Sequence, residues 1–165
     1  MYLNFLPIRM FRETPQVTFF DAGVRASNGC DVVIHHRSAI SPPNDVEYEQ
    51  YYVHQYQIDH NLVLEGNRKF TLLNPSWDEP HHVIFLKRDM GALQIPIGTY
   101  HRSVSGKEGS IVINQAIRDG QFEPNTEFNP ISIKNRSDLQ KAKSIEPIIW
   151  LWKDGDIKII KDSIT

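Results

Sequence analysis

The sequence predicts an all-β domain, either a sandwich or a barrel. Glycine and proline divide the chain at short intervals, and the stretches between them are short and rich in Val, Ile, Phe and Tyr. Such β-branched and aromatic stretches favour strands. Almost no helical pattern precedes residue 135. Many short strands with frequent turns are typical of sandwiches and barrels, and periodicity alone does not choose between the two.

The expected elements follow this punctuation along the chain. The strands are Val17–Phe20, Asp31–His36, Gln50–Tyr56, Asn61–Glu65, Arg68–Leu73, His82–Leu86, Ala92–Ile95, His101–Val104 and Ser110–Gln115. Ser137 and Gln140 are spaced as in a capping box and predict a short helix through about Lys143. In the tail, Asp154-Gly155 provides the positive φ values of a tight turn, which predicts a hairpin of residues 148–152 and 157–160.

Length and charge limit the classes of partner. The 165 residues suit one domain, for which we expect a core at about 17–116 and an extension at about 120–165. A formal charge of −2 and the lack of a Lys/Arg run give no reason to expect nucleic acid or an anionic membrane as partner. The apolar start of the chain is too short for a secretory signal or a membrane span. Cys30 is the one cysteine, which fits a reducing compartment, so we expect a cytoplasmic protein.

The most specific motif is the segment from Gly91 to His101. Pro96 ends a strand because it donates no hydrogen bond to a ladder, Gly98 permits a turn geometry closed to other residues, and His101 opens the next strand. The spacing proline, any residue, glycine, two residues, histidine resembles the second signature of the cupin superfamily of RmlC-like jelly-roll barrels. The resemblance implies a double-stranded β-helix in which His101 points into the barrel.

The first cupin signature is matched in part. Leu62-Val63-Leu64-Glu65-Gly66 resembles the stretch that closes it, and counting back from Gly66 reaches Asp59 and then His54. The resemblance therefore implies three metal ligands, His54, Asp59 and His101, but Tyr52 stands where the family has its fourth, a histidine. A shifted register would put His54 first, with Tyr56 in the second position and His60 nearby.

Two kinds of chemistry follow from these residues. Two histidines and one carboxylate suit Zn, Fe, Mn or Ni and leave positions open for substrate, as in non-haem iron oxygenases. The alternative is a site without metal: the segment around His54 and Tyr56 is similar to that of sugar-nucleotide 3,5-epimerases, in which a histidine acts as a base. We then expect His54 or His101 as the base and Tyr52, Tyr56 or Tyr100 as the proton donor, with Tyr52 and Tyr100 also lining the substrate pocket.

Strand alternation adds a pocket residue and separates two candidates. Asn61 is expected on the same face as Asp59, and His60 on the opposite face, so His60 and Asp59 do not both face the cavity. The structural alternatives are a turn histidine that caps a backbone group for His101, a hydrogen-bonded core histidine for His54 and a turn aspartate for Asp59. Arg102 is a candidate for pairing with an anionic group.

Three hypotheses remain open at this point. The first is a metal-dependent cupin enzyme, an oxygenase or an isomerase, acting on a small polar metabolite such as a sugar derivative. The second is a metal-free epimerase or isomerase, and the third is a barrel that binds a small ligand without catalysis. Because a barrel of this type has strand edges to protect, we also expect a homodimer.

Overall fold

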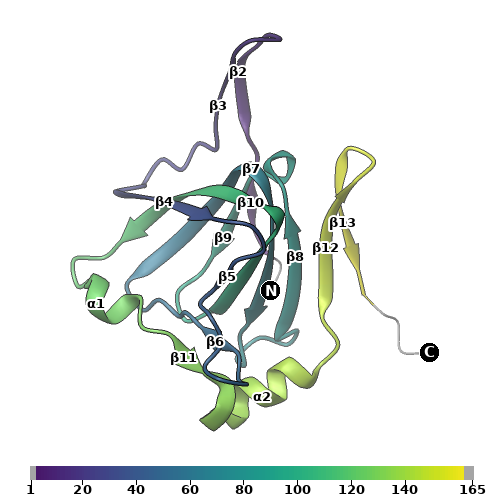
Figure 1. Cartoon of the computed structure of the whole chain (residues 1–165). Helices are drawn as coiled ribbons and strands as arrows, with labels where there is room; N and C mark the ends of the chain where they lie inside the picture. Colours follow the sequence, from purple (N-terminus) through teal and green to yellow (C-terminus); the bar gives the residue numbers. More distant parts are fainter. Residues whose placement is uncertain (1–2, 162–165) are drawn as a thin grey trace.

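The protein is a curled structure built mostly of β-strands, as the sequence predicts (Figure 1). A computed structural model describes residues 3–161; residues 1–2 and 162–165 of the predicted domain lie outside this range. The strands are β1 (Phe5–Leu6), β2 (Arg9–Glu13), β3 (Thr18–Asp21), β4 (Gly29–His35), β5 (Ile40–Ser41), β6 (Gln50–Tyr51), β7 (Gln57–Leu73), β8 (His81–Leu86), β9 (Ala92–Ile95), β10 (Tyr100–Arg118), β11 (Ile131–Ser132), β12 (Ile148–Lys153) and β13 (Asp156–Ile160). The helices are α1 (Pro124–Glu127) and α2 (Ser137–Ser144), with single 3₁₀ turns at Arg88–Met90 and Ile133–Asn135. No helix within residues 3–161 is long and apolar enough to span a membrane.

Two long antiparallel strands, β7 and β10, form the frame of the barrel. Each joins two of the strands that the sequence predicts separately, because Gly66 and Gly109 lie within strands instead of ending them. Both glycines have positive φ, and the β7–β10 register shifts between Ser105 and Ser110 and again after Ile111. A Cβ on Gly66 would lie 2.3 Å from the carbonyl oxygen of Gly109, so the two backbones approach as only glycine allows.

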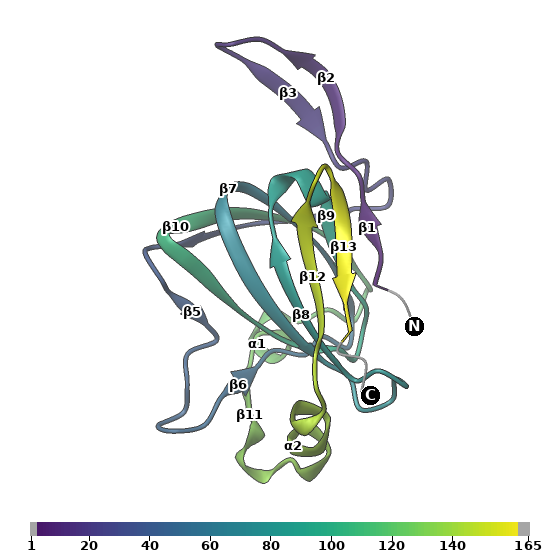
Figure 2. The same cartoon turned by 90° about the vertical axis from the view of Figure 1, so that its right-hand side faces the viewer.

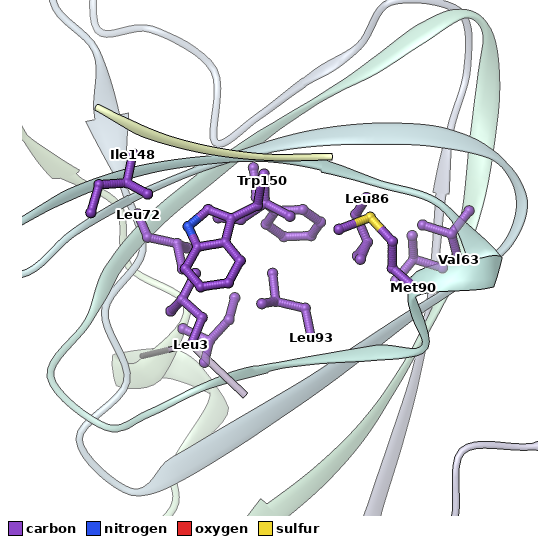
Figure 3. Packing of buried hydrophobic residues seen from close by; sticks show 12 residues of the cluster. Leu3, Val63, Leu72, Leu86, Met90, Leu93, Ile148 and Trp150 are labelled. Atoms are coloured by element: carbon purple, nitrogen blue, oxygen red, sulfur yellow. The ribbon is translucent and has the colours of Figure 1, made fainter. Parts of the chain in front are cut away.

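The apolar core fills one part of the barrel interior (Figure 3). Val63 and Leu72, from the two halves of β7, pack in one cluster with Leu93 of β9 and Trp150 of β12. Side chains from both halves of one strand meet in this cluster because the strand curves around the interior. The core therefore fixes the curvature that brings distant parts of β7 and β10 together.

The short helix α2 lies at one end of the barrel, beside the end of β7 (Figures 1 and 2). Leu139 and Ala142 of α2 pack on Leu73 and on Tyr51 of β6. The predicted helix is confirmed, but its N-cap is Arg136 without a side-chain cap bond, so the capping-box interpretation is wrong. The predicted tail hairpin is also confirmed: β12 pairs with β13 around Asp154-Gly155, both with positive φ.

The predicted strand Gln50–Tyr56 is mostly wrong. Pairing is limited to β6 and one isolated bridge from Tyr52 to His101, after which the chain leaves the sheet. The backbone N–H groups of Gln55 and Tyr56 instead donate to the carboxylate of Glu127, at 3.0 and 3.2 Å. A side chain from α1 thus replaces a neighbouring strand, and this departure releases His54 from the ladder.

Strands β2 and β3 form a hairpin that projects away from the barrel (Figures 1 and 2). The sequence predicts only its second strand. The salt bridge between Arg9 and Asp21, at 2.6 Å, closes the base of the hairpin, while Phe11 and Phe19 are exposed on it.

Candidate active site

Three predicted residues meet inside the barrel. His54 lies in the segment between β6 and β7, Asp59 in the first half of β7 and His101 near the start of β10. The Nε2 atoms of His54 and His101 lie 3.5 and 3.6 Å from the same carboxylate oxygen, Oδ2 of Asp59. The two imidazole centroids are 5.0 Å apart, and all three residues are buried. The convergence implied by the sequence motifs is present.

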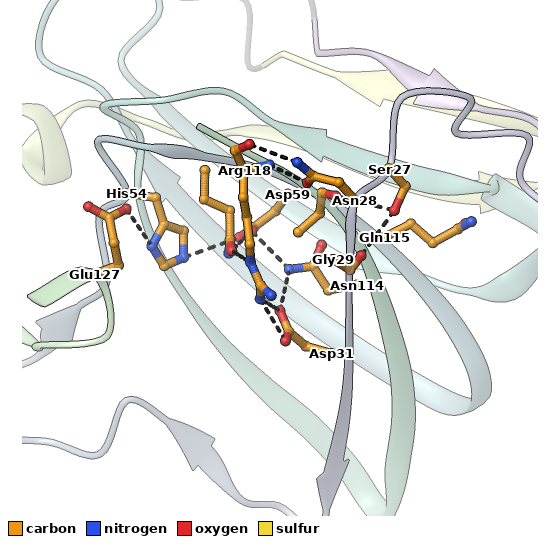
Figure 4. A network of polar contacts seen from close by, with 12 residues as sticks. Ser27, Asn28, Gly29, Asp31, His54, Asp59, Asn114, Gln115, Arg118 and Glu127 are labelled. Carbon is orange, nitrogen blue, oxygen red and sulfur yellow. Dashed lines mark hydrogen bonds and ion pairs between the residues drawn. The ribbon is translucent and has the colours of Figure 1, made fainter. Parts of the chain in front are cut away.

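Asp59 is held as an ionised carboxylate by its neighbours (Figure 4). Its Oδ1 accepts hydrogen bonds from the side-chain amides of Gln57, at 2.6 Å, and Asn114, at 2.9 Å. Burial alone would raise the pKa of this carboxyl. Hydrogen bonding from His54, the positive charge on either imidazole and the Asn114 amide outweigh burial and lower the pKa to about 2. A permanent negative charge therefore lies between the two histidines.

His101 is held as a neutral imidazole. Its Nδ1 lies 3.1 Å from the carbonyl oxygen of Thr99, which only accepts, so Nδ1 carries the hydrogen. Burial lowers the pKa of His101 to about 4, and the attraction of Asp59 does not reverse this effect. Nε2 then carries an unprotonated lone pair that faces the cavity, as a general base or a metal ligand requires.

His54 lies between two carboxylates, which favour its protonated state. Its Nδ1 lies 3.6 Å from Oε2 of Glu127, while Nε2 faces Asp59. Burial would lower the pKa of His54, but the hydrogen bond and charge of Asp59, together with the charge of Glu127, raise it above its usual value. The two imidazoles of the site thus differ in proton affinity, which is how one site acquires both an acid and a base.

Glu127 is a site residue that the sequence did not indicate. It is 4% exposed and lies at the end of α1, a segment in which the strand pattern has already been lost. Pro124 at the helix start signals a turn there. No feature of the sequence marks the carboxylate three residues later as buried against His54.

The three residues line a cavity of about 200 Å³. Its walls are formed by Asp31, Val33, Ser41, Tyr52, His54, Asp59, Asn61, Arg68, Phe70, His101, Ser103, Asn114 and Phe128. The predicted pocket residues Tyr52 and Asn61 are among them. Phe128 contacts His54 edge to face, with centroids 5.3 Å apart. Ligand sites commonly measure about 300–1,000 Å³, so this cavity encloses the reacting part of a ligand and not a large molecule.

Two predicted tyrosines lie outside the cavity. Tyr56 is exposed, because the chain has left the sheet there and its backbone turns toward Glu127. Tyr100 precedes His101 on β10 and therefore points to the opposite face, where its hydroxyl accepts a hydrogen bond from Arg136 at 2.8 Å. The predictions of Tyr56 as a catalytic residue and Tyr100 as a pocket residue are therefore wrong.

Alternation along β7 and β10 also determines the face of the sheet on which His60 and Arg102 lie. The ring of His60 lies 3.1 Å from Gln94 and from the carbonyl of Gln115, away from the cavity, so the shifted register with Tyr56 and His60 as ligands is wrong. Arg102 points outward and forms a 2.8 Å salt bridge with Glu49. It is therefore not the anion-binding candidate of the cavity.

The donor set fits a metal ion. One donor atom from each of His54, Asp59 and His101 lies within 4.8 Å of the others. Both histidines present Nε2 while Nδ1 faces an oxygen of Thr99 or Glu127, an arrangement that orients imidazoles toward metals in proteins. Binding of an ion by these residues stays a prediction.

The fold is that of an RmlC-like cupin barrel. No family model matches the chain, and no curated protein sequence matches it. The solved structure of QdtA, a sugar 3,4-ketoisomerase from Thermoanaerobacterium thermosaccharolyticum in complex with TDP, aligns over 86% of this chain and 94% of its own, with a TM-score of 0.59 and 12% identity. A 3,4-ketoisomerase from Helicobacter canadensis aligns over 87% and 99%, with a TM-score of 0.57 and 12% identity.

A third similar structure comes from the epimerases. The dTDP-6-deoxy-D-glucose-3,5-epimerase RmlC from Legionella pneumophila, in complex with dTDP-4-keto-L-rhamnose, aligns over 84% of this chain and 81% of its own, with a TM-score of 0.54 and 12% identity. At such identities the likeness establishes the shared barrel, and the chemistry of this chain has to be argued from its own residues.

Proposed function

We propose that this protein is a metal-independent isomerase or epimerase of a keto sugar, most directly a nucleotide-linked one. The observation that carries the proposal is the pair of buried imidazoles, His54 and His101, that lie on either side of ionised Asp59 and have pKa values shifted in opposite directions. The fold supports the substrate class, because the similar structures include sugar ketoisomerases and an epimerase solved with TDP or a dTDP-linked keto sugar.

The chemistry needs one base and one acid. In the proposed step, Nε2 of neutral His101 accepts the proton from a carbon next to the carbonyl group. The electron pair of that C–H bond forms a C=C bond, and the carbonyl oxygen takes a proton from Nε2 of protonated His54. For the epimer, a donor on the opposite face, Tyr52, protonates the same carbon while the enol O–H returns its proton to His54. For the isomer, the proton on His101 adds to the former carbonyl carbon while the hydroxyl on the first carbon gives its proton to His54 and becomes the new carbonyl. Asp59 stabilises the imidazolium on each side during the cycle.

The remaining site residues position these groups. Glu127 places a carboxylate oxygen 3.6 Å from Nδ1 of His54, and Thr99 fixes the tautomer of His101. Phe128 packs on His54 and forms part of the cavity wall. Tyr52 lines the cavity and lies 6.2 Å, centroid to centroid, from His101, so its phenol is the tyrosine available as a proton donor in place of Tyr56 and Tyr100.

The test is solvent deuterium exchange. The protein is incubated in D₂O with chelator and dTDP-, UDP- or GDP-linked 4-keto-6-deoxy sugars, and deuterium at the carbons next to the carbonyl is measured by NMR. We expect exchange that falls at least about 10²-fold in His101→Asn, the usual contribution of a general base, and persists in His36→Gln, which changes an exposed histidine. Binding without exchange across the panel would contradict the proposal and favour a non-catalytic binding barrel.

A metal-dependent activity is the second candidate. The converging Nε2, Nε2 and Oδ2 donors of His54, His101 and Asp59 favour it. Elemental analysis of protein purified without a histidine tag distinguishes the two: about one transition metal per chain, lost in His101→Ala, supports this candidate. Full deuterium exchange in the presence of chelator would count against it.

We also propose that the protein forms a homodimer in the cytoplasm. The projecting β2–β3 hairpin supports the dimer, because Phe11 and Phe19 are 66% and 53% exposed and two further apolar side chains, Met10 and Val17, are exposed beside them. Light scattering at micromolar concentration should give twice the chain mass, and Phe11→Asp should lower it. A monomer in the unaltered protein would refute the proposal.

A further inference from the structure

One charged residue of the cavity has no role in the proton transfers described above. Arg68, on β7, is 2% exposed and lines the same cavity as His54 and His101. Its Nε donates to Oγ of Ser110 at 3.0 Å, and Nη2 donates to the carbonyls of Val33 and Ser110 at 3.2 and 3.4 Å. All of these acceptors are neutral.

No carboxylate among residues 3–161 forms a salt bridge with Arg68. The two acidic groups of the cavity are already engaged: Asp31 accepts hydrogen bonds from Arg118, at 2.6 and 2.7 Å, and from Asn114, at 3.4 Å, and Asp59 lies between the histidines. Burial without a counter-charge lowers the pKa of Arg68 to about 10, so the guanidinium remains charged at neutral pH. Buried charges are normally paired, which makes an unpaired arginine in a cavity a sign of an external partner.

The free side of the guanidinium is Nη1. It forms no hydrogen bond within the described part of the chain, yet it is not among the fully enclosed polar atoms. Two N–H donors of a charged group are therefore available in the cavity. A phosphate or carboxylate oxygen is the acceptor that such a group binds most strongly.

We propose that Arg68 binds an anionic group, a phosphate or a carboxylate, of the ligand whose other end reaches His54 and His101. The identity of the ligand's other end, a keto sugar, rests on the proposed function. The binding of an anionic group by Arg68 does not. Arg68 pairs with Ser105, four residues along β10 from His101, which is about 13 Å along the strand. The anionic group thus lies several bonds away from the carbon that loses its proton.

Binding by calorimetry tests the assignment without turnover. The probes are TDP and inorganic pyrophosphate for a phosphate source, and malonate for a carboxylate source. We expect Arg68→Met to weaken binding at least about tenfold and Arg68→Lys less. The matched control is Arg102→Met, a buried arginine on the outer face that pairs with Glu49, and it should bind as the unaltered protein does. Equal affinity of Arg68→Met and the unaltered protein, or no binding of any probe to the unaltered protein, would overturn the proposal.

A second measurement needs no substitution at Arg68. The positive charge of Arg68 adds to burial in lowering the pKa of His35 to about 4, so an anion bound to Arg68 should raise the pKa of the His35 imidazole. NMR titration with and without saturating pyrophosphate or malonate reads this shift; an unchanged His35 titration under a bound probe would overturn the assignment. The two proposals can fail separately. If anion binding depends on Arg68 but no deuterium exchange occurs, only the proposed function is contradicted. If exchange occurs but Arg68→Met binds anions as the unaltered protein does, only the anion site is contradicted.

Discussion

Acidification from pH 7 to pH 5 should destabilise this protein through histidines that are buried in the neutral state. His101 and His35 both have their pKa lowered to about 4, from an ordinary value of 6.5, with burial as the main cause. Between pH 6.5 and pH 4 the unfolded chain binds a proton at each histidine and the folded chain does not. The stability of the fold is therefore lost as the pH falls through this window.

The magnitude follows from the two pKa values. For one histidine whose pKa is shifted from 6.5 to about 4, linkage gives a loss of about 2 kcal/mol in the free energy of unfolding between pH 7 and pH 5, and of roughly 3 kcal/mol once the pH is well below 4. His101 and His35 together should therefore lower the free energy of unfolding by about 4 kcal/mol between pH 7 and pH 5. That is a large share of the usual stability of a domain of this size, roughly 5–15 kcal/mol.

Urea unfolding at both pH values measures this loss. The readout is the difference between pH 7 and pH 5 for each variant, so a constant change in stability cancels. We expect His101→Gln to reduce the loss by about 2 kcal/mol and the control His36→Gln, at an exposed position, to leave it unchanged. An equal loss in His101→Gln and the unaltered protein would refute burial of a neutral His101 as the physical cause.

Further predictions concern the support of the site and the barrel. Glu127→Gln should lower the pKa of His54, because it removes one of the two carboxylates that raise it; NMR titration checks the shift, and an unchanged His54 would contradict the contact. Leu139→Ala should cost about 2–5 kcal/mol in urea unfolding, because Leu139 is fully buried between α2 and the barrel, against Leu73 and Tyr51. Gly66→Ala should lower the yield of folded protein or cost more than about 1 kcal/mol, since its Cβ would overlap the Gly109 carbonyl at positive φ; wild-type stability would argue against the close approach.

Local spacing predicted part of the site. His101 was identifiable because Pro96 and Gly98 fix a strand end and a turn before it, and these requirements are visible in the sequence. Asp59 followed from the resemblance to the first cupin signature, and Asn61 followed from strand alternation relative to Asp59, which the structure keeps. Predictions failed for Tyr56, because they assumed a strand at a place where the chain leaves the sheet.

The features of the site and the fold that could not be predicted from the sequence depend on contacts between distant segments. Glu127 reaches His54 across 73 positions of the chain, and nothing near it in the sequence indicates burial. In the sequence Arg68 is an ordinary arginine of a predicted strand. The curvature of β7, which the sequence does not reveal, places its side chain in the cavity. Gly66 and Gly109 are read as strand ends from sequence, yet their backbones approach within one continuous ladder.

The most direct test of the central claim is the protonation of the two cavity imidazoles in solution. Long-range ¹H–¹⁵N NMR spectra recorded from pH 4 to pH 8 report the tautomer and charge of each ring. At pH 6.5 we expect His101 to be neutral with its proton on Nδ1, and His54 to be more than half protonated. Two rings that titrate together near pH 6.5, or a His101 proton on Nε2, would contradict the acid and base roles assigned to this site.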